Sequence, residues 1–83
     1  MNLPEYLVLF SNEGTIDVHV KFEESGVSIA VRKMKPKEIS VLISKDGKGF
    51  YNHMTFDDHR FAICKYEIDP INDRLTILTK NIP

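Results

Sequence analysis

The densest group of side chains that could carry out chemistry consists of His53, Asp57, Asp58 and His59. Imidazole and carboxylate groups bind divalent transition metals, or act as a general base and its orienting partner, when folding brings them within roughly 3 to 5 Å. The spacing matches no known metal-binding signature, and no pair of cysteines reinforces it. We therefore expect no metal site and interpret Asp57 and Asp58 as turn residues that accept hydrogen bonds from local backbone amides. A metal-dependent hydrolase using His53, Asp57 and His59 is the weaker hypothesis.

Two other features could suggest catalysis. Cys64 is the only cysteine and lies among apolar residues of a predicted strand, where a thiol is usually an inert part of the core. Gly47 and Gly49 follow Lys45 closely, but the glycine spacing and the Lys-Ser/Thr pair of a phosphate-binding loop are missing. A hairpin turn explains both glycines. We expect no enzymatic activity and no cofactor.

A basic segment is the one specific electrostatic feature. Residues 32–37 contain four cationic side chains, which could bind phosphates while Phe50 or Tyr51 stacks on bases. Acidic residues are equally dense in neighbouring segments, so solvated charge is the ordinary interpretation. Single-stranded nucleic-acid binding is therefore kept as the alternative function. Its residues would be Arg32, Lys33, Lys35 and Lys37.

Length and composition limit the classes of protein that fit. The 83 residues, of which 42% are apolar and 28% charged, suit a single domain over 1–83. The formal net charge of −1 argues against a basic protein that wraps duplex nucleic acid. One cysteine, no leader-like start and no apolar run near the ~20 residues of a membrane helix indicate cytoplasmic residence without membrane contact.

Residues 15–23 give the clearest structural signal. Apolar and polar side chains alternate there without exception, a period of two that a helix face cannot produce. The polar positions Asp17, His19 and Lys21 should therefore form one outward row on a strand. A turn around Gly26 then leads into a second strand, which completes a hairpin.

In this second strand we expect Val27, Ile29 and Val31 to point inward and Arg32 to point outward beside the first row. A strand over residues 39–44 and the Asp-Gly turn at 46–47 predict a second hairpin. A short helix beginning at Pro36 is the alternative for residues 36–47.

A third hairpin is expected from residues 60–68 and 75–78, because β-branched and aromatic residues flank a turn at 69–73. A helix opening at Thr55 competes for residues 55–63, with Asp58 as its capping acid. Residues 6–10 are apolar on both faces of a predicted strand. Such a strand must be covered on both sides, by this chain, by a second copy or by another protein.

These patterns predict an all-β domain, a small antiparallel barrel or compact sandwich of six or seven short strands, with one short helix as an option. We expect a non-enzymatic protein-binding module that acts as an inhibitor, immunity protein or adaptor, of the kind found among phage or mobile-element accessory proteins. Its partner would be another protein, and a homodimer is an alternative. Aromatic and arginine side chains dominate such contacts. The expected contact residues are Asp17, His19, Lys21, Arg32, Phe50 and Tyr51.

Overall fold

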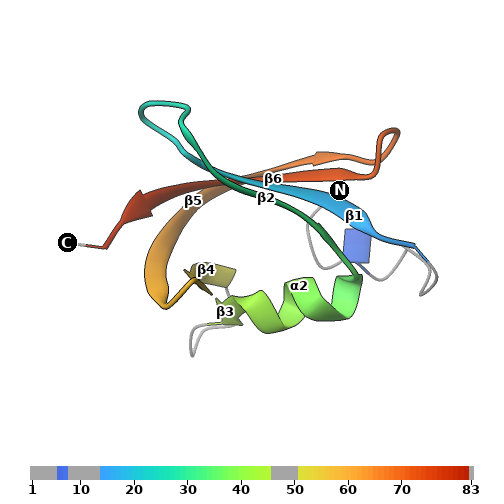
Figure 1. Ribbon diagram of the computed structural model, residues 1–83, viewed down its shortest axis with the longest axis horizontal. Helices are drawn as coiled ribbons and strands as arrows, with labels where there is room; N and C mark the ends of the chain where they lie inside the picture. The colour runs from blue at the N-terminus through green and yellow to red at the C-terminus, as the bar shows by residue number, and fades with distance from the viewer. Residues whose placement is uncertain (1–5, 8–13, 46–50, 83) are drawn as a thin grey trace.

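The computed structural model describes residues 6–7, 14–45 and 51–82 of the chain. Strands dominate these residues, which confirms the all-β class, and they form one sheet in the order β2-β1-β6-β5-β4-β3. The sheet curls into a half-barrel with helix α2 on its concave side (Figure 1). The elements are β1 (Ile16–Phe22), β2 (Ser28–Met34), α2 (Pro36–Leu42), β3 (Ile43–Lys45), β4 (Tyr51–Phe56), β5 (His59–Asp69) and β6 (Arg74–Asn81).

Strand pairing is mixed. The first and third predicted hairpins are confirmed, because β1 pairs with β2 and β5 pairs with β6 in antiparallel orientation. The β1–β6 pair is parallel, with Val18 opposite Leu75. The expectation of a wholly antiparallel sheet is therefore wrong. Turn signals identify hairpins between consecutive strands, whereas a parallel pair joins distant parts of the chain and leaves no local signal.

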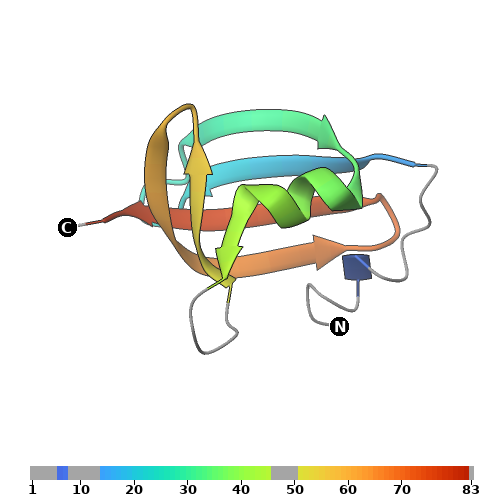
Figure 2. The same cartoon turned by 90° about the horizontal axis from the view of Figure 1, so that it is seen from below.

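The core fills the concave side of the sheet. Its centre combines the inward side chains of β1 and β6 with one residue from α2 and one from β4, and Figure 2 shows the helix lying across these strands. Each such side chain contributes about 1.5 to 3 kcal/mol when it is removed from water. Among the described residues, the fully buried apolar side chains are Ile16, Val18, Val20, Ile39, Met54, Leu75 and Ile77.

Helix α2 replaces most of the strand expected over residues 39–44. Pro36 occupies its first turn, where a missing N–H costs no hydrogen bond. The Lys35 N–H donates to Glu38 Oε1 at 3.0 Å, which fixes the start of the helix. Ile39 is its buried residue. The short helix offered as an option at Pro36 is thus confirmed, and it ends at Leu42 before β3 pairs with β4. No helix of the described residues is long and apolar enough to cross a membrane.

After Ile29, which packs against the core as predicted, β2 faces the opposite way from the prediction. Val27 and Val31 are 57% and 51% exposed, whereas Ala30 is buried. The register shifts opposite Val20 and Lys21, because Ile29 is an extra residue in β2. An extra residue exchanges the two faces of every later position in a strand of period two. The inward assignment of Val31 and the outward assignment of Arg32 are therefore wrong. The inward assignment of Val27 is wrong as well, but Val27 precedes the extra residue and lies between the turn and β2.

Two smaller expectations also differ, and one alternative is wrong. Cys64 is exposed rather than buried, because it sits where the β5–β6 register shifts between Ile63 and Lys65. Thr55 lies in β4, so no helix opens there. Tyr6, expected in a strand, is helical and buried against the core. The rest of that apolar segment, residues 8–10, lies outside the described residues.

Candidate functional site

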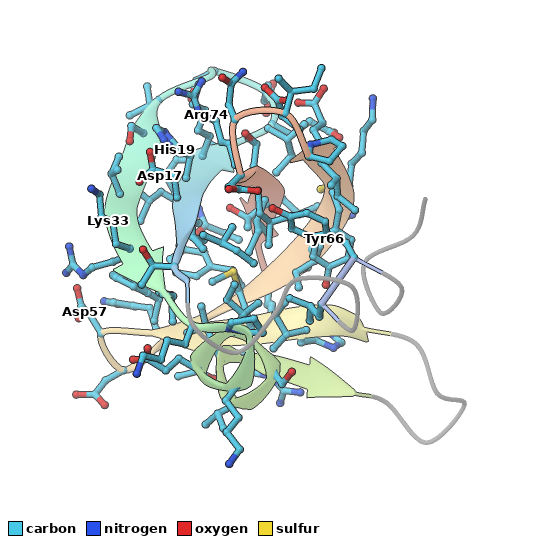
Figure 3. All side chains as sticks on the ribbon, turned by 90° about the vertical axis from the view of Figure 1, so that its right-hand side faces the viewer. Asp17, His19, Lys33, Asp57, Tyr66 and Arg74 are labelled. Atoms are coloured by element: carbon cyan, nitrogen blue, oxygen red, sulfur yellow. The ribbon has the colours of Figure 1, made fainter. Side chains whose placement is uncertain are left out.

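The outward row of β1 lies on the convex face of the sheet. Asp17, His19 and Lys21 alternate with buried side chains and are themselves half-buried. Opposite them on β2, Lys33 pairs with Asp17, and Val31 pairs with His19. Figure 3 shows Asp17, His19, Lys33 and Arg74 grouped on this side of the molecule. The row predicted from the period of two is therefore present as one surface.

Arg32 does not belong to that surface. It pairs with Val18, whose side chain is in the core, so Arg32 projects from the concave side. Its guanidinium carbon lies 5.2 Å from the centroid of the Phe56 ring. The sheet thus separates Arg32 from the convex row. Phe50 lies outside the described residues, and Tyr51 is placed only as the first residue of β4.

The basic segment is likewise divided. Arg32 and Lys33 are consecutive strand residues and point to opposite faces of the sheet. Lys35 precedes α2, and Lys37 lies in its first turn. All four cations are exposed, but they follow the end of β2 and the start of α2 rather than lining one groove.

The candidate metal ligands do not converge. His59 pairs with Phe56 at the end of the β4–β5 hairpin, on the face that carries Met54. His53 is the residue before Met54, so it lies on the other face. Within the described segments, no group of three His, Cys, Asp or Glu residues could hold a metal ion.

β2 is the edge strand of the sheet that the described residues form. In β1, the Phe22 N–H donates to Val27 O at 3.0 Å beside β2, whereas the Asp17 N–H donates to Asp73 O at 2.8 Å beside β6. Even-numbered residues of β1 therefore direct their N–H and C=O groups toward β2. Their register partners in β2 direct the same groups toward β1.

It follows that Val31 and Lys33 direct their N–H and C=O groups away from β1. β2 is the last strand in the sheet order, so no strand of the described chain lies on that side. The contact there is a long hydrogen bond of 3.4 Å from Arg32 Nη1 to Val31 O. An exposed edge with free backbone groups is a template for a further strand.

Charged side chains form a row across four strands of the convex face. Lys33, Asp17, Arg74 and Asp69 are successive register partners from β2 to β5, and the sign of the charge alternates along the row. Hydrogen bonds from Asn72 lower the pKa of Asp69, and Arg74 lowers it further. Asp17 and Lys33 also line a shallow hollow of about 210 Å³.

The adjacent row of the convex face, which contains His19, has a buried polar atom without a hydrogen-bond partner. His19 Nε2 is buried and has no hydrogen-bond partner, although the ring belongs to a half-buried residue. Its register partners are Val31 and Thr76. Buried ring nitrogens usually have a partner, so His19 Nε2 is an exception to that rule.

Sequence reasoning missed Val31 and Arg74 as members of this site. The alternation in the sequence predicts Val31 as a core residue, and Arg74 directly follows the turn predicted at 69–73 without being assigned a role. Neither position carries a sequence signal that reveals an edge or a row across strands. Compared with protein-family models and with curated protein sequences, the chain matches none.

Proposed function

We propose that this protein is a non-enzymatic protein-binding module, acting as an inhibitor, immunity protein or adaptor, that receives an extended strand of its partner on the β2 edge. The observation that carries this proposal is the outward direction of the backbone groups of Val31 and Lys33. Strand addition uses such groups for affinity and the alternate side chains for specificity.

The edge supplies a limited amount of binding energy by itself. Val31 and Lys33 offer two N–H and two C=O groups, of which Val31 O already accepts the long bond from Arg32, and each hydrogen bond contributes about 0.5 to 1.5 kcal/mol net. Side chains must therefore add to the affinity. Val31 is an exposed apolar residue on the edge, and the outward side chains of Asp17 and His19 on β1 lie next to it.

Nucleic-acid binding remains the alternative. It is supported by the exposure of all four cations in residues 32–37. These cations are distributed over two faces of β2 and the start of α2, whereas a phosphate backbone is bound best by a continuous basic groove. Nucleic-acid binding is therefore less well supported than the binding of a protein strand. This alternative predicts an affinity that falls steeply with salt.

A proline at position 31 tests the proposal. Val31→Pro removes an N–H that faces away from β1, so the β1–β2 hydrogen bonds stay in place. Val31→Thr is the matched control, because it keeps both the N–H and the strand propensity. We expect the wild-type protein and Val31→Thr to retain the same protein from a lysate of the source cells at fixed stoichiometry, at low and high salt. We expect Val31→Pro to lose it.

Two outcomes would contradict the proposal. Equal retention by Val31→Pro, with the fold verified by circular dichroism, would show that the β2 edge is not used. Recovery of nucleic acid that is lost at high salt, with no retained protein, would move the function to the basic residues.

A further inference from the structure

We propose that the strand received by β2 carries an acidic side chain opposite Lys33 and an apolar side chain opposite Val31, both on the convex face. This inference rests on the proposed function and names the chemistry of the partner. Val31 and Lys33 are two positions apart on one face, so the two partner side chains must also be two positions apart.

The alternating charged row provides the first argument. From β5 to β2 it runs Asp69, Arg74, Asp17, Lys33, and each interior member has a neighbour of opposite sign on both sides. Lys33 ends the row and, within the described residues, has such a neighbour only on its β1 side. An added strand would place its own side chain directly beside Lys33, where an opposite charge is stabilising and a like charge is not.

The neighbouring position of the edge provides the second argument. Val31 is 51% exposed and has His19 as its register partner on β1. An apolar side chain on the added strand would cover the open side of Val31.

A second copy of this chain does not meet these requirements through the same edge. β2 contains two cationic residues, Arg32 and Lys33, and no acidic residue. No register of β2 against its own copy can therefore place a carboxylate opposite Lys33. A symmetric pairing centred on either cation would instead oppose like charges. The partner strand is therefore not β2 of a second copy.

Two synthetic peptides of about ten residues, the upper length of common strands, are the probes. They have the same alternating Val and Thr sequence and differ at one central position, which is Glu in one and Lys in the other. We expect the Glu peptide to shift the backbone amide NMR signals of Val31 and Lys33 and to bind roughly five- to tenfold more tightly than the Lys peptide.

Charge reversal at the edge sharpens the test. Lys33→Glu should invert the preference, so that the Lys peptide binds more tightly. Lys37→Glu is the matched control, because it changes the net charge equally, lies in the first turn of α2 where an acidic residue is tolerated, and is not on the edge. It should leave the preference for the Glu peptide in place.

The outcomes separate this inference from the proposed function. Equal affinity for both peptides, with shifts at Val31 and Lys33, would overturn the acidic partner and leave strand addition standing. No shift at either residue with any peptide would overturn both. A dimer that forms through β2 and is abolished by Val31→Pro would overturn the inference in favour of a second copy.

Discussion

The guanidinium of Arg32 lies 5.2 Å from the ring centroid of Phe56, which joins β2 to β4 across the concave side of the half-barrel. These strands are not neighbours in the sheet order, so backbone hydrogen bonds do not connect them. The side-chain contact therefore helps to hold the edge strand in its curled position. A cation over an aromatic face contributes about 0.5 to 1 kcal/mol at an exposed site.

Removing this contact should lower stability by a measurable amount. We expect Arg32→Ala and Phe56→Leu each to reduce the free energy of unfolding in urea, with a coupling energy of about 0.5 to 1 kcal/mol in a double-mutant cycle. Lys33→Ala, next to Arg32 but on the opposite face, is the control. Strictly additive effects of the two substitutions would show that the cation and the ring do not interact.

The β4–β5 turn should gain stability from a change of sequence. Asp57 and Asp58 have φ values of 47° and 65°, the geometry of a two-residue turn that favours Asn-Gly. Replacing them by Asn and Gly should raise the free energy of unfolding by about 1 kcal/mol, because aspartate is strained at positive φ.

Gly26 gives the opposite change for comparison. It has a φ of 72°, and no atom lies within 4 Å of the position that a Cβ would take there. Gly26→Ala should therefore lower stability by about 1 kcal/mol through backbone strain alone.

Urea unfolding of both variants measures these changes. If the variant with Asn and Gly in place of Asp57 and Asp58 were less stable than the wild type, contacts of the two aspartates would outweigh their strain.

Two residues of α2 should respond very differently to the same truncation. Ile39 is fully buried, so Ile39→Ala should cost about 2 to 5 kcal/mol, a large part of the roughly 4 to 12 kcal/mol expected for a chain of this size. Val41 is 86% exposed, and Val41→Ala should change stability by less than about 0.5 kcal/mol. Thermal and urea unfolding of the two variants measure these losses of stability. Similar losses would mean that α2 does not pack as described.

Acid should weaken the turn before β6. Hydrogen bonds from Asn72 hold the pKa of Asp69 below its ordinary value. A lowered pKa in the folded state adds stability that is present above the unfolded value of about 3.9 and is lost as the pH falls through the folded value. Asp69→Asn should therefore reduce the loss of stability between neutral and acidic pH.

The NMR titration of Asp69 provides the direct measurement. Asn72→Ala should move its midpoint upward, because the largest cause of the lowered pKa is removed. An unchanged midpoint would show that Asn72 does not hold the carboxylate.

The sequence predicts the local elements well and their assembly poorly. The strict alternation of β1 identifies its buried face because each position depends only on its neighbours. The face of β2 could not be predicted, since one extra residue at Ile29 reverses it and no residue type marks a bulge of this kind. Helix α2 follows from the sequence as an alternative because Pro36 gives a recognisable start.

The candidate site depends on the parts that could not be predicted. The polar row of β1 follows from periodicity, but the edge status of β2 depends on the order of all strands. The pairing of Asp17 with Arg74 between the parallel strands β1 and β6 depends on that strand order as well. The prediction for Arg32 fails for the same reason as that for Val31, because the bulge lies between them and the turn.

The parallel β1–β6 pair has a consequence for how the chain folds. The Thr79 hydroxyl donates to Lys21 O at 3.0 Å although the two residues are 58 positions apart in the sequence. Contacts of such long range require a large loop to close before they contribute, which raises the contact order and slows folding. The β1–β2 and β5–β6 hairpins can form early from local contacts. Docking of β1 against β6 is then the slow step, and substitutions at that junction should change the folding rate more than substitutions in either turn.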